Sequence, residues 1–295
     1  MAFLHNPAFR IAAAPGWRNI AGIKLIYSVF STPSTRKPHS SMPEQNNRYG
    51  RLASQVYHLD KPIGHSFGDV EFYLERLQHC PGPILEPAAG NGRILIPLLQ
   101  AGLDVRGFDA SAEMLALCQS ECALRGLAAP VSCQTFEHFH YEQSFAAIVI
   151  PAGSFQLITD YDAASAVLAR CFQHLQTRGR LILDLDPAHA IQAGGHSLRA
   201  WQPAPRQQLT LTCDRLSTDH INQVSVDLLR YEAWDDGVLQ ATELESFSLR
   251  WWGVREMLAA LRAAGFSDIT VSGGYAHGRW PTDADAIITF EAIKR

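Results

Sequence analysis

A carboxylate and a glycine-rich turn stand together in the stretch ILEPAAGNGR, residues 84–93. An apolar run predicts a buried strand that Glu86 closes, and Gly90 and Gly92 follow before a second apolar run with the pattern of a helix. Because glycine has no side chain, a ligand can lie directly against the main chain there. With the helix expected over Asn91–Gln100, backbone N–H groups and a helix N-terminus would also face the ligand.

A second carboxylate, Asp109, ends the next strand-like run, VRGFD, seventeen positions after Gly92. An acid at this distance from such a turn can accept hydrogen bonds from the two hydroxyls of a ribose. The alternative is that the glycines merely start one helix and that Asp109 caps the next one with Ser111. The strand-helix-strand context favours a cofactor that carries a nucleoside.

The residues of the turn also help to decide between two nucleoside cofactors, a nicotinamide dinucleotide and a methyl donor. A dinucleotide fingerprint requires a third glycine, and Ile94 and Leu95 stand where it is expected. Glu86 is unexpected beside a pyrophosphate but can pair with the ammonium of an amino-acid group. The sequence therefore favours a methyl donor over a nicotinamide dinucleotide, which stays open as a third candidate.

Alternating strand-like and helix-like runs must position these residues. The short connections predict an α/β fold with a doubly wound, mostly parallel sheet. Helices are expected at 69–80, 91–100, 111–125 and 161–175, and strands at 83–87, 103–109, 130–134, 145–152 and 179–186.

The alternation breaks after Asp186. Three runs with strand character, at 207–216, 221–234 and 238–252, are joined by the turn-like segments STDH and DDG. Asp236-Gly237 between two such runs is a strong hairpin signal. The sequence therefore predicts an antiparallel β insertion, followed by a helix at 254–264 that Gly265 stops and by strands near 268–273 and 285–293.

Composition narrows the partners and the compartment. The formal net charge of −4 over 295 residues gives no broad electrostatic footprint for nucleic acid. No charge-free apolar run reaches the roughly 18 residues of a membrane span. The six cysteines are scattered without Cys-x-x-Cys pairs, so we expect no metal, reduced thiols and a cytoplasmic location.

The first 43 residues contain no acid and end in a Pro/Ser-rich stretch. Such a composition is that of a transit peptide, a poorly ordered extension, or an upstream start of a protein that begins at Met42. Pro15 and Gly16 interrupt the helical pattern, which favours the last two.

From about Tyr49 to Arg295, the chain resembles the class I S-adenosylmethionine-dependent methyltransferases. ILEPAAGNGR resembles the family's first motif, VRGFDAS the second and FAAIVIPAGSFQLITD that of the fourth strand. The late stretch LRWWGVREMLAALRAAGFSDITV resembles the final helix and strand. The resemblance implies a seven-stranded, Rossmann-like sheet and S-adenosylmethionine as cofactor.

The resemblance also divides the chain. It implies an extension at 1–45, an N-terminal helical lid at 46–82, and a cofactor-binding domain made of 83–187 and 250–295. The antiparallel insertion at 188–249 would cap the substrate pocket or pair two subunits as a homodimer.

Carried over position by position, the resemblance predicts the cofactor site. Ala88 replaces a third glycine, and the acid that the family commonly places on the adenine is replaced in CQTFEHF, so Gln134, Thr135 and Phe136 are expected beside the adenine. The full predicted set is Tyr49, Glu86, Ala88, Gly90, Asn91, Gly92, Asp109, Ala110, Met114, Thr135, Phe136 and Pro151.

Methyl transfer from a sulfonium requires alignment and exclusion of water rather than a covalent step. A base helps where the acceptor is a hydroxyl or a protonated amine, and the candidates are Tyr57, His58 and His65. The predicted substrate pocket consists of Ser154, Phe155, Gln156, Trp251, Trp252 and Tyr275.

The expected acceptor is a small molecule methylated at nitrogen or oxygen. IPAGSF lacks the Asn/Asp-Pro-Pro-aromatic turn of enzymes that methylate nucleic-acid bases. A protein or RNA methyltransferase and a non-catalytic module that binds S-adenosylmethionine remain the alternatives.

Overall fold

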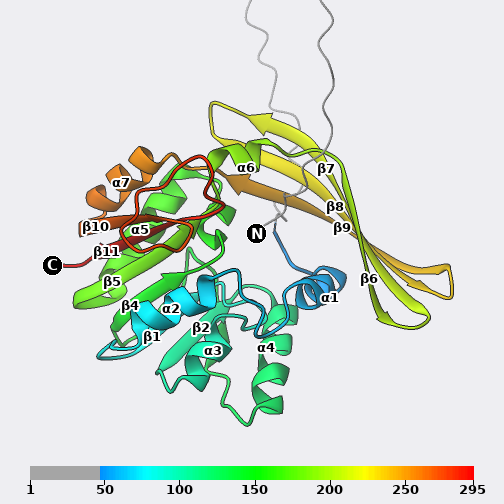
Figure 1. The fold of residues 1–295 in the computed structure, drawn as a ribbon, viewed down its shortest axis with the longest axis horizontal. Coiled ribbons are helices and arrows are strands. Elements are labelled where there is room, and N and C mark those ends of the chain that lie inside the picture. The colour runs from blue at the N-terminus through cyan, green and yellow to red at the C-terminus, as the bar shows by residue number, and fades with distance from the viewer. Residues whose placement is uncertain (1–46) are drawn as a thin grey trace, which may run out of the picture. The chain divides into compact units, whose positions relative to one another are not determined.

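The computed structural model describes residues 47–295, which belong to one compact unit (Figure 1). The expected extension at 1–45 lies outside these residues. A seven-stranded sheet has the order β10-β11-β5-β4-β1-β2-β3. Only β11 runs antiparallel to its neighbours within it, which confirms the predicted mostly parallel α/β fold. The strands are β1 Ile84–Pro87, β2 Val105–Asp109, β3 Val131–Cys133, β4 Phe145–Ile150, β5 Leu175–Leu185, β10 Ser267–Gly273 and β11 Ile288–Ile293.

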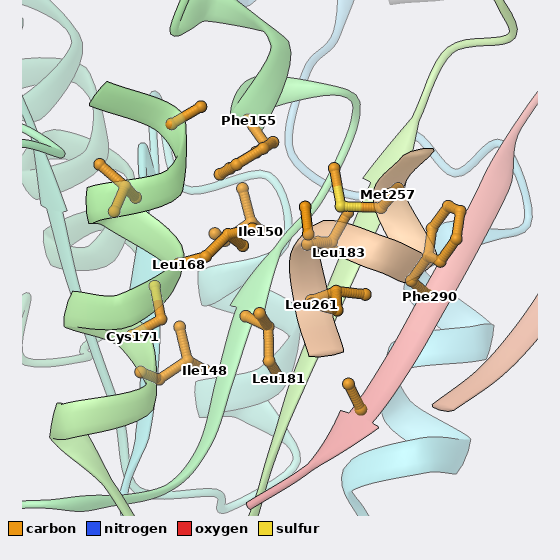
Figure 2. Close-up of a cluster of buried hydrophobic side chains, with 14 of the residues drawn as sticks. Ile148, Ile150, Phe155, Leu168, Cys171, Leu181, Leu183, Met257, Leu261 and Phe290 are labelled. Atoms are coloured by element: carbon orange, nitrogen blue, oxygen red, sulfur yellow. The ribbon is translucent and has the colours of Figure 1, made fainter. Parts of the chain in front are cut away.

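Helices cover both faces of this sheet. The helices of the described residues are α1 Arg51–Asp60, α2 Asp69–Leu77, α3 Leu95–Gln100, α4 Ala112–Leu124, α5 Tyr161–His174, α6 Ala188–Gln192 and α7 Val254–Ala263, with a 3-10 turn η1 at Ser154–Leu157. Of these, α2, α3, α4, α5 and α7 cover the sheet, whereas α1 packs on the antiparallel insertion. Side chains from β4 and β5 pack against α5 and α7 on one face, as Figure 2 shows for Ile148, Leu181 and Leu261. On the opposite face, α2, α3 and α4 complete a second apolar cluster.

Strand order fixes where a ligand can lie. From β1 the chain moves outward through β2 to β3, and it then returns to the other side of β1 with β4. The order reverses between β1 and β4, where the connecting segments leave in opposite directions. In open α/β sheets, ligands bind in the crevice outside the strand ends at such a point. The turns that follow β1, β2, β4 and β5 therefore form the candidate site.

The insertion has one strand more than the sequence predicted. Its antiparallel sheet consists of β6 Ser197–Ala204, β7 Gln207–Asp219, β8 Val224–Asp235 and β9 Val238–Arg250. β6 is an edge strand, where Pro203 is tolerated because the missing N–H leaves no ladder bond unmade. The predicted turn at STDH is wrong, because β7 continues through Asp219.

The hairpin expected at Asp236-Gly237 is confirmed. Both residues have left-handed backbone angles, with φ of 50° and 76°, which suit the twist of a two-residue hairpin. One face of this sheet packs on α1 through a third apolar cluster, which includes Leu52, Val56 and Leu211.

The helix expected from Asn91 begins only at Leu95 and has six residues. Left-handed backbone at Ala88, Gly90 and Gly92, with φ of 54°, 58° and 88°, is incompatible with a helix before that point. The candidate site is therefore an extended turn of main chain, and a helix N-terminus is not its main feature. None of the helices in residues 47–295 is long and apolar enough to cross a membrane.

Candidate functional site

The two glycines of the β1–α3 turn have different physical roles. A Cβ at Gly92 would lie 2.8 Å from Sγ of Cys118 and 2.9 Å from Cδ1 of Ile96, so close packing on α4 requires glycine there. A Cβ at Gly90 would meet nothing within 4 Å. Gly90 therefore leaves open space beside the main chain, as a site for a bound group requires.

Asp109 joins the end of β2 to this turn. Its Oδ2 accepts a hydrogen bond of 2.9 Å from the Gly90 N–H, and its Oδ1 accepts one of 2.8 Å from the Ser111 N–H. Burial raises the pKa of Asp109, while these N–H donors act in the opposite direction. Each carboxylate oxygen keeps a second lone pair, which a ribose hydroxyl could use. Ser111 is the N-cap of α4, where its Oγ accepts from the Met114 N–H at 3.1 Å.

Glu86 is an acid with unmet hydrogen-bonding capacity. Its side chain is 2% exposed, and Oε2 has no partner among the described residues. Burial raises the pKa of Glu86 well above its usual value, although the charge of Arg93 opposes this. Buried polar atoms without partners are rare and mark places where a missing group belongs. An ammonium group would supply both the opposite charge and the donor.

Arg93 ties α2 and the segment before it to the β1–α3 turn, a role that the sequence did not reveal. Its Nη1 and Nη2 donate to the two carboxylate oxygens of Asp69 at 3.0 and 2.5 Å, and Nη1 also donates to the His65 carbonyl at 3.1 Å. Burial raises the pKa of Asp69, but hydrogen bonding and the charge of Arg93 outweigh it and lower that pKa. The pair spans 24 positions of sequence, and no local pattern could have signalled it.

Tyr49, just before α1, and Tyr57, within it, place this helix beside the β1–α3 turn and the start of α4. The Tyr49 carbonyl accepts a 2.8 Å hydrogen bond from Oγ of Ser111, and the two rings meet edge to face at 5.9 Å. Burial raises the pKa of Tyr57, against the opposing charge of Arg93. Tyr49 has a left-handed backbone with φ of 49°. A strained residue of this kind is held by its surroundings and is common at functional sites.

His58 and His65 are placed differently. Nδ1 of His58 lies 3.1 Å from Nδ2 of Asn91, and Nε2 lies 3.3 Å from Oε1 of Glu121. The two ring nitrogens therefore hold α1 against the turn on one side and against α4 on the other. A role as a base would require one of these two contacts to break. The His65 ring is exposed and packs on Phe67 at 4.6 Å, and the site uses its carbonyl.

The predicted adenine neighbours lie after β2 and β3. Met114 is buried in α4, and Ala110 is exposed between β2 and α4. Phe136 is buried with its ring 6.0 Å from that of Phe108, whereas Thr135 is exposed. The structure thus offers both an apolar wall and an exposed hydroxyl at this end of the crevice.

Of the predicted substrate pocket, two residues belong to the packed core. Phe155 and Trp252 are 0% and 2% exposed, and their rings lie 5.7 Å apart (Figure 2 shows Phe155). Trp251 is buried in the cluster between α1 and the insertion sheet. The structure therefore does not support these three residues as pocket walls.

The segment after β4 is shaped by its backbone. Pro151 is buried, and Ala152 and Gly153 follow it with left-handed φ of 55° and 71°. Ser154 is half-buried at the start of η1. The Gln156 amide is fully occupied, because Nε2 donates to the Asp186 carbonyl at 3.2 Å and Oε1 accepts from the Asp186 N–H at 2.7 Å.

Two acids at the end of β5 were not singled out by the sequence. Asp184 is fully buried and accepts hydrogen bonds from the Tyr275 hydroxyl at 3.0 Å, from Oγ1 of Thr289 at 2.7 Å and from the Ala152 N–H at 3.1 Å. Asp186 is 7% exposed and lies beside the segment after β4. Tyr275, predicted as a pocket residue, thus contacts the end of β5 through its hydrogen bond to Asp184. The sequence feature that could have pointed to Asp184 and Asp186 is the acid-rich end of LILDLD.

No metal centre is evident among residues 47–295, because no three His, Cys, Asp or Glu side chains there gather closely enough to hold an ion.

Comparison with known proteins gives the site its context. Residues 84–179, which include the turn, Asp109 and the segment after β4, match the family model described as a methyltransferase domain. No curated protein sequence matches the chain.

Solved structures match most of the chain. A S-adenosylmethionine-dependent methyltransferase from Clostridium acetobutylicum is 16% identical, with a TM-score of 0.67, and the match covers 83% of this chain and 98% of that one. The sugar N-methyltransferase KedS8 from Streptoalloteichus is 18% identical over 91% and 100% of the two chains, with a TM-score of 0.66. CalS10, an amino pentose methyltransferase from Micromonospora echinaspora with bound S-adenosylmethionine, is 17% identical over 85% and 99%, with a TM-score of 0.60. At these identities the likeness is one of fold.

Proposed function

We propose that this chain, in which residues 84–179 match a methyltransferase domain, transfers a methyl group from S-adenosylmethionine to a nitrogen or oxygen atom of a small molecule. S-adenosylmethionine supplies an electrophilic methyl group on a sulfonium, which has an excellent leaving group. The chain itself must hold the nucleoside, align the acceptor and keep water out.

The observation that carries the proposal is the buried Oε2 of Glu86, which has no hydrogen-bond partner among residues 47–295. It suits the ammonium of the methionine group, which would supply a charge and a donor to Oε2. Asp109, two positions beyond Gly107 on the neighbouring strand, would accept from the ribose hydroxyls while it still holds the Gly90 N–H. The open space at Gly90 lets the ligand run between these two acids.

Tyr49 and Tyr57 would cover the bound nucleoside. Both tyrosines belong to the segment that Arg93, Asp69 and Ser111 fasten to the sheet. Covering the site excludes water, and this strengthens the electrostatic contacts inside it. We propose the range 46–82 as the lid on this basis.

Three observations support a small acceptor over a macromolecule. The formal net charge of −4 opposes non-specific attraction to nucleic acid. Asp186, a buried acid that directly follows β5, would repel a phosphate group at this edge of the sheet. The solved structures of a sugar N-methyltransferase and an amino pentose methyltransferase share this fold. Those activities are the activities of those two proteins, and they support a small acceptor here by analogy of fold.

A methyl-release assay tests the proposal. The purified chain is incubated with methyl-labelled S-adenosylmethionine and a panel of small amines and alcohols, and label in the product is counted. We expect transfer to at least one member of the panel. Binding of S-adenosylmethionine without transfer to any member of the panel would contradict a small-molecule methyltransferase, and absence of transfer also to added peptides and RNA would support a non-catalytic binding module.

A further inference from the structure

We infer that Asp186 forms an anionic subsite at the acceptor end of the crevice, and that this subsite takes the ammonium group of an amine acceptor. The inference rests on the proposed function and makes it more specific, because it selects nitrogen over oxygen. Nothing in the motif pattern had singled out Asp186.

Asp186 lies where an acceptor must enter. It directly follows the carboxyl end of β5, beside β4 and the point where strand order reverses. Its Oδ2 lies against the segment after β4, because a Cβ built at Gly153 would be only 3.2 Å from that oxygen. Glycine at 153 therefore leaves the carboxylate room at the edge of the crevice.

The main chain of Asp186 is held rigidly. Gln156 donates to its carbonyl at 3.2 Å and accepts from its N–H at 2.7 Å. Gln156 is itself 0% exposed, so this clamp is buried. The fixed backbone presents the carboxylate in one place, which is what recognition of a small ligand requires.

Within residues 47–295, the side chain of Asp186 is less engaged than that of Asp184. Although Asp186 is 7% exposed, its side-chain oxygens accept no hydrogen bond from any residue in 47–295. Asp184, two positions earlier, accepts three and is a structural acid. Burial raises the pKa of Asp186, and the charge of Lys61 opposes this. A buried acid with unused capacity favours a cationic ligand.

The chemistry follows from that charge. An acceptor of the form R–NH₃⁺ would bind through an ion pair and must lose one proton before it can react. The N–H bond breaks with its electron pair left on nitrogen, and a carboxylate oxygen of Asp186 takes the proton to form an O–H bond. The lone pair on nitrogen is then the nucleophile, and the fixed position of Asp186 aims it along the crevice.

Two nucleosides test the subsite without knowledge of the acceptor. Sinefungin carries an ammonium on carbon where S-adenosylmethionine carries its methylsulfonium, and S-adenosylhomocysteine has a neutral thioether there. Their dissociation constants are measured by calorimetry for the wild type, Asp186→Asn and Asp186→Glu. Asp162→Asn removes an exposed carboxylate of α5 as the matched control.

We expect the wild type to bind sinefungin at least tenfold more tightly than S-adenosylhomocysteine. Asp186→Asn should reduce that ratio about tenfold and leave the affinity for S-adenosylhomocysteine within threefold, while Asp186→Glu restores part of the ratio. Asp162→Asn should change neither affinity.

An unchanged ratio in Asp186→Asn, or an equal loss of affinity for both nucleosides, would overturn the subsite and leave the methyltransferase proposal standing. Failure of the wild type to bind either nucleoside would overturn both proposals together.

Discussion

The buried carboxylate of Glu86 destabilises the ligand-free protein when it is ionised. A bound ligand with a positive charge would remove this destabilisation. A carboxylate that is 2% exposed and has an oxygen without a partner in residues 47–295 is unfavourable when ionised. Its raised pKa means that the folded state holds its proton more tightly than the unfolded state does. The stability that it contributes is therefore present at low pH and lost as pH rises through the folded pKa.

Replacement of Glu86 by Gln should separate stability from binding. Glu86→Gln keeps the shape and removes the charge, so we expect equal or higher thermal stability at pH 8 than the wild type has. The affinity for S-adenosylmethionine should fall about tenfold or more, since one charge-assisted hydrogen bond contributes about 1.5–3 kcal/mol. Thermal melts and calorimetry measure both, and a destabilised variant with unchanged affinity would contradict the assignment.

Gly90 and Gly92 allow a matched comparison at the residue scale. Alanine at either position adopts a left-handed backbone, which costs about 1 kcal/mol. Gly90→Ala adds a methyl group to open space, so we expect weaker cofactor binding with little further loss of stability. Gly92→Ala should lose about 1–3 kcal/mol more because its methyl group meets Cys118 and Ile96. Urea unfolding and calorimetry distinguish the two, and equal stabilities would refute this division of roles.

At the element scale, α1 is held by the insertion sheet. Oε2 of Glu243 on β9 accepts from the Leu52 N–H at 3.0 Å, and Glu245 accepts from the Tyr49 N–H at 3.0 Å. Asn47 and Ser248 exchange two hydrogen bonds of 2.9 Å. A long-range acid thus satisfies helix N–H groups that a local N-cap would usually satisfy, since Gly50 has no side chain to do so. The insertion therefore sets the position of the lid.

Removal of this cap should loosen the lid. Glu243→Ala is expected to cost about 0.5–2 kcal/mol, the usual effect of a lost N-cap, and to weaken S-adenosylmethionine binding through Tyr49 and Tyr57. Hydrogen exchange of residues 51–60 should accelerate in this variant. Glu232→Ala, which alters a neighbouring strand and does not contact α1, is the control. Unchanged exchange in α1 would show that the sheet does not hold the lid.

Asp184 joins β5, β11 and the segment that carries Tyr275. Burial raises its pKa to about 6, against the hydrogen bonds from Thr289, the Ala152 N–H and Tyr275. Because the folded state binds this proton more tightly than the unfolded state, stability should fall as pH rises from about 4 to about 6. A shift of this size corresponds to about 2–3 kcal/mol.

Asp184→Asn should remove that pH dependence. The amide can still accept from the Ala152 N–H and Tyr275 and donate to the Thr289 hydroxyl, so the fold is expected to persist. Urea unfolding of both proteins between pH 4 and pH 7 gives the comparison. The same decline in stability in both proteins would assign it to another group.

At the scale of the whole molecule, local pattern predicted more of the scaffold than of the site. The alternation of runs predicted the doubly wound, mostly parallel sheet, because strand and helix periodicity are local properties, and the family resemblance implied its seven strands. It placed the start of α3 four residues too early, since only the left-handed backbone of the turn reveals where helix can begin. It missed β6 because exposed, Pro-containing edge strands have weak patterns.

The same limit applies to the site residues. Glu86, Gly90 and Asp109 were predicted because each follows a recognisable strand end. The Arg93–Asp69 pair and the roles of Asp184 and Asp186 depend on contacts between distant segments, so spacing could not reveal them. Trp252 was predicted as a pocket wall from its position at the end of the insertion, and tertiary packing buries it.

In this molecule α1 packs against the insertion sheet and against α4, and the crevice lies where the seven-stranded sheet reverses its strand order. The central claim is that a sulfonium nucleoside lies there on the turn at Gly90, with Asp109 on its ribose. The dissociation constant of S-adenosylmethionine for the wild type and for Asp109→Ala, measured by calorimetry on folded protein, tests it most directly. We predict a loss of tenfold to a hundredfold, as expected for hydrogen bonds to a charged group worth about 1.5–3 kcal/mol. Equal affinity in the two proteins would contradict the account.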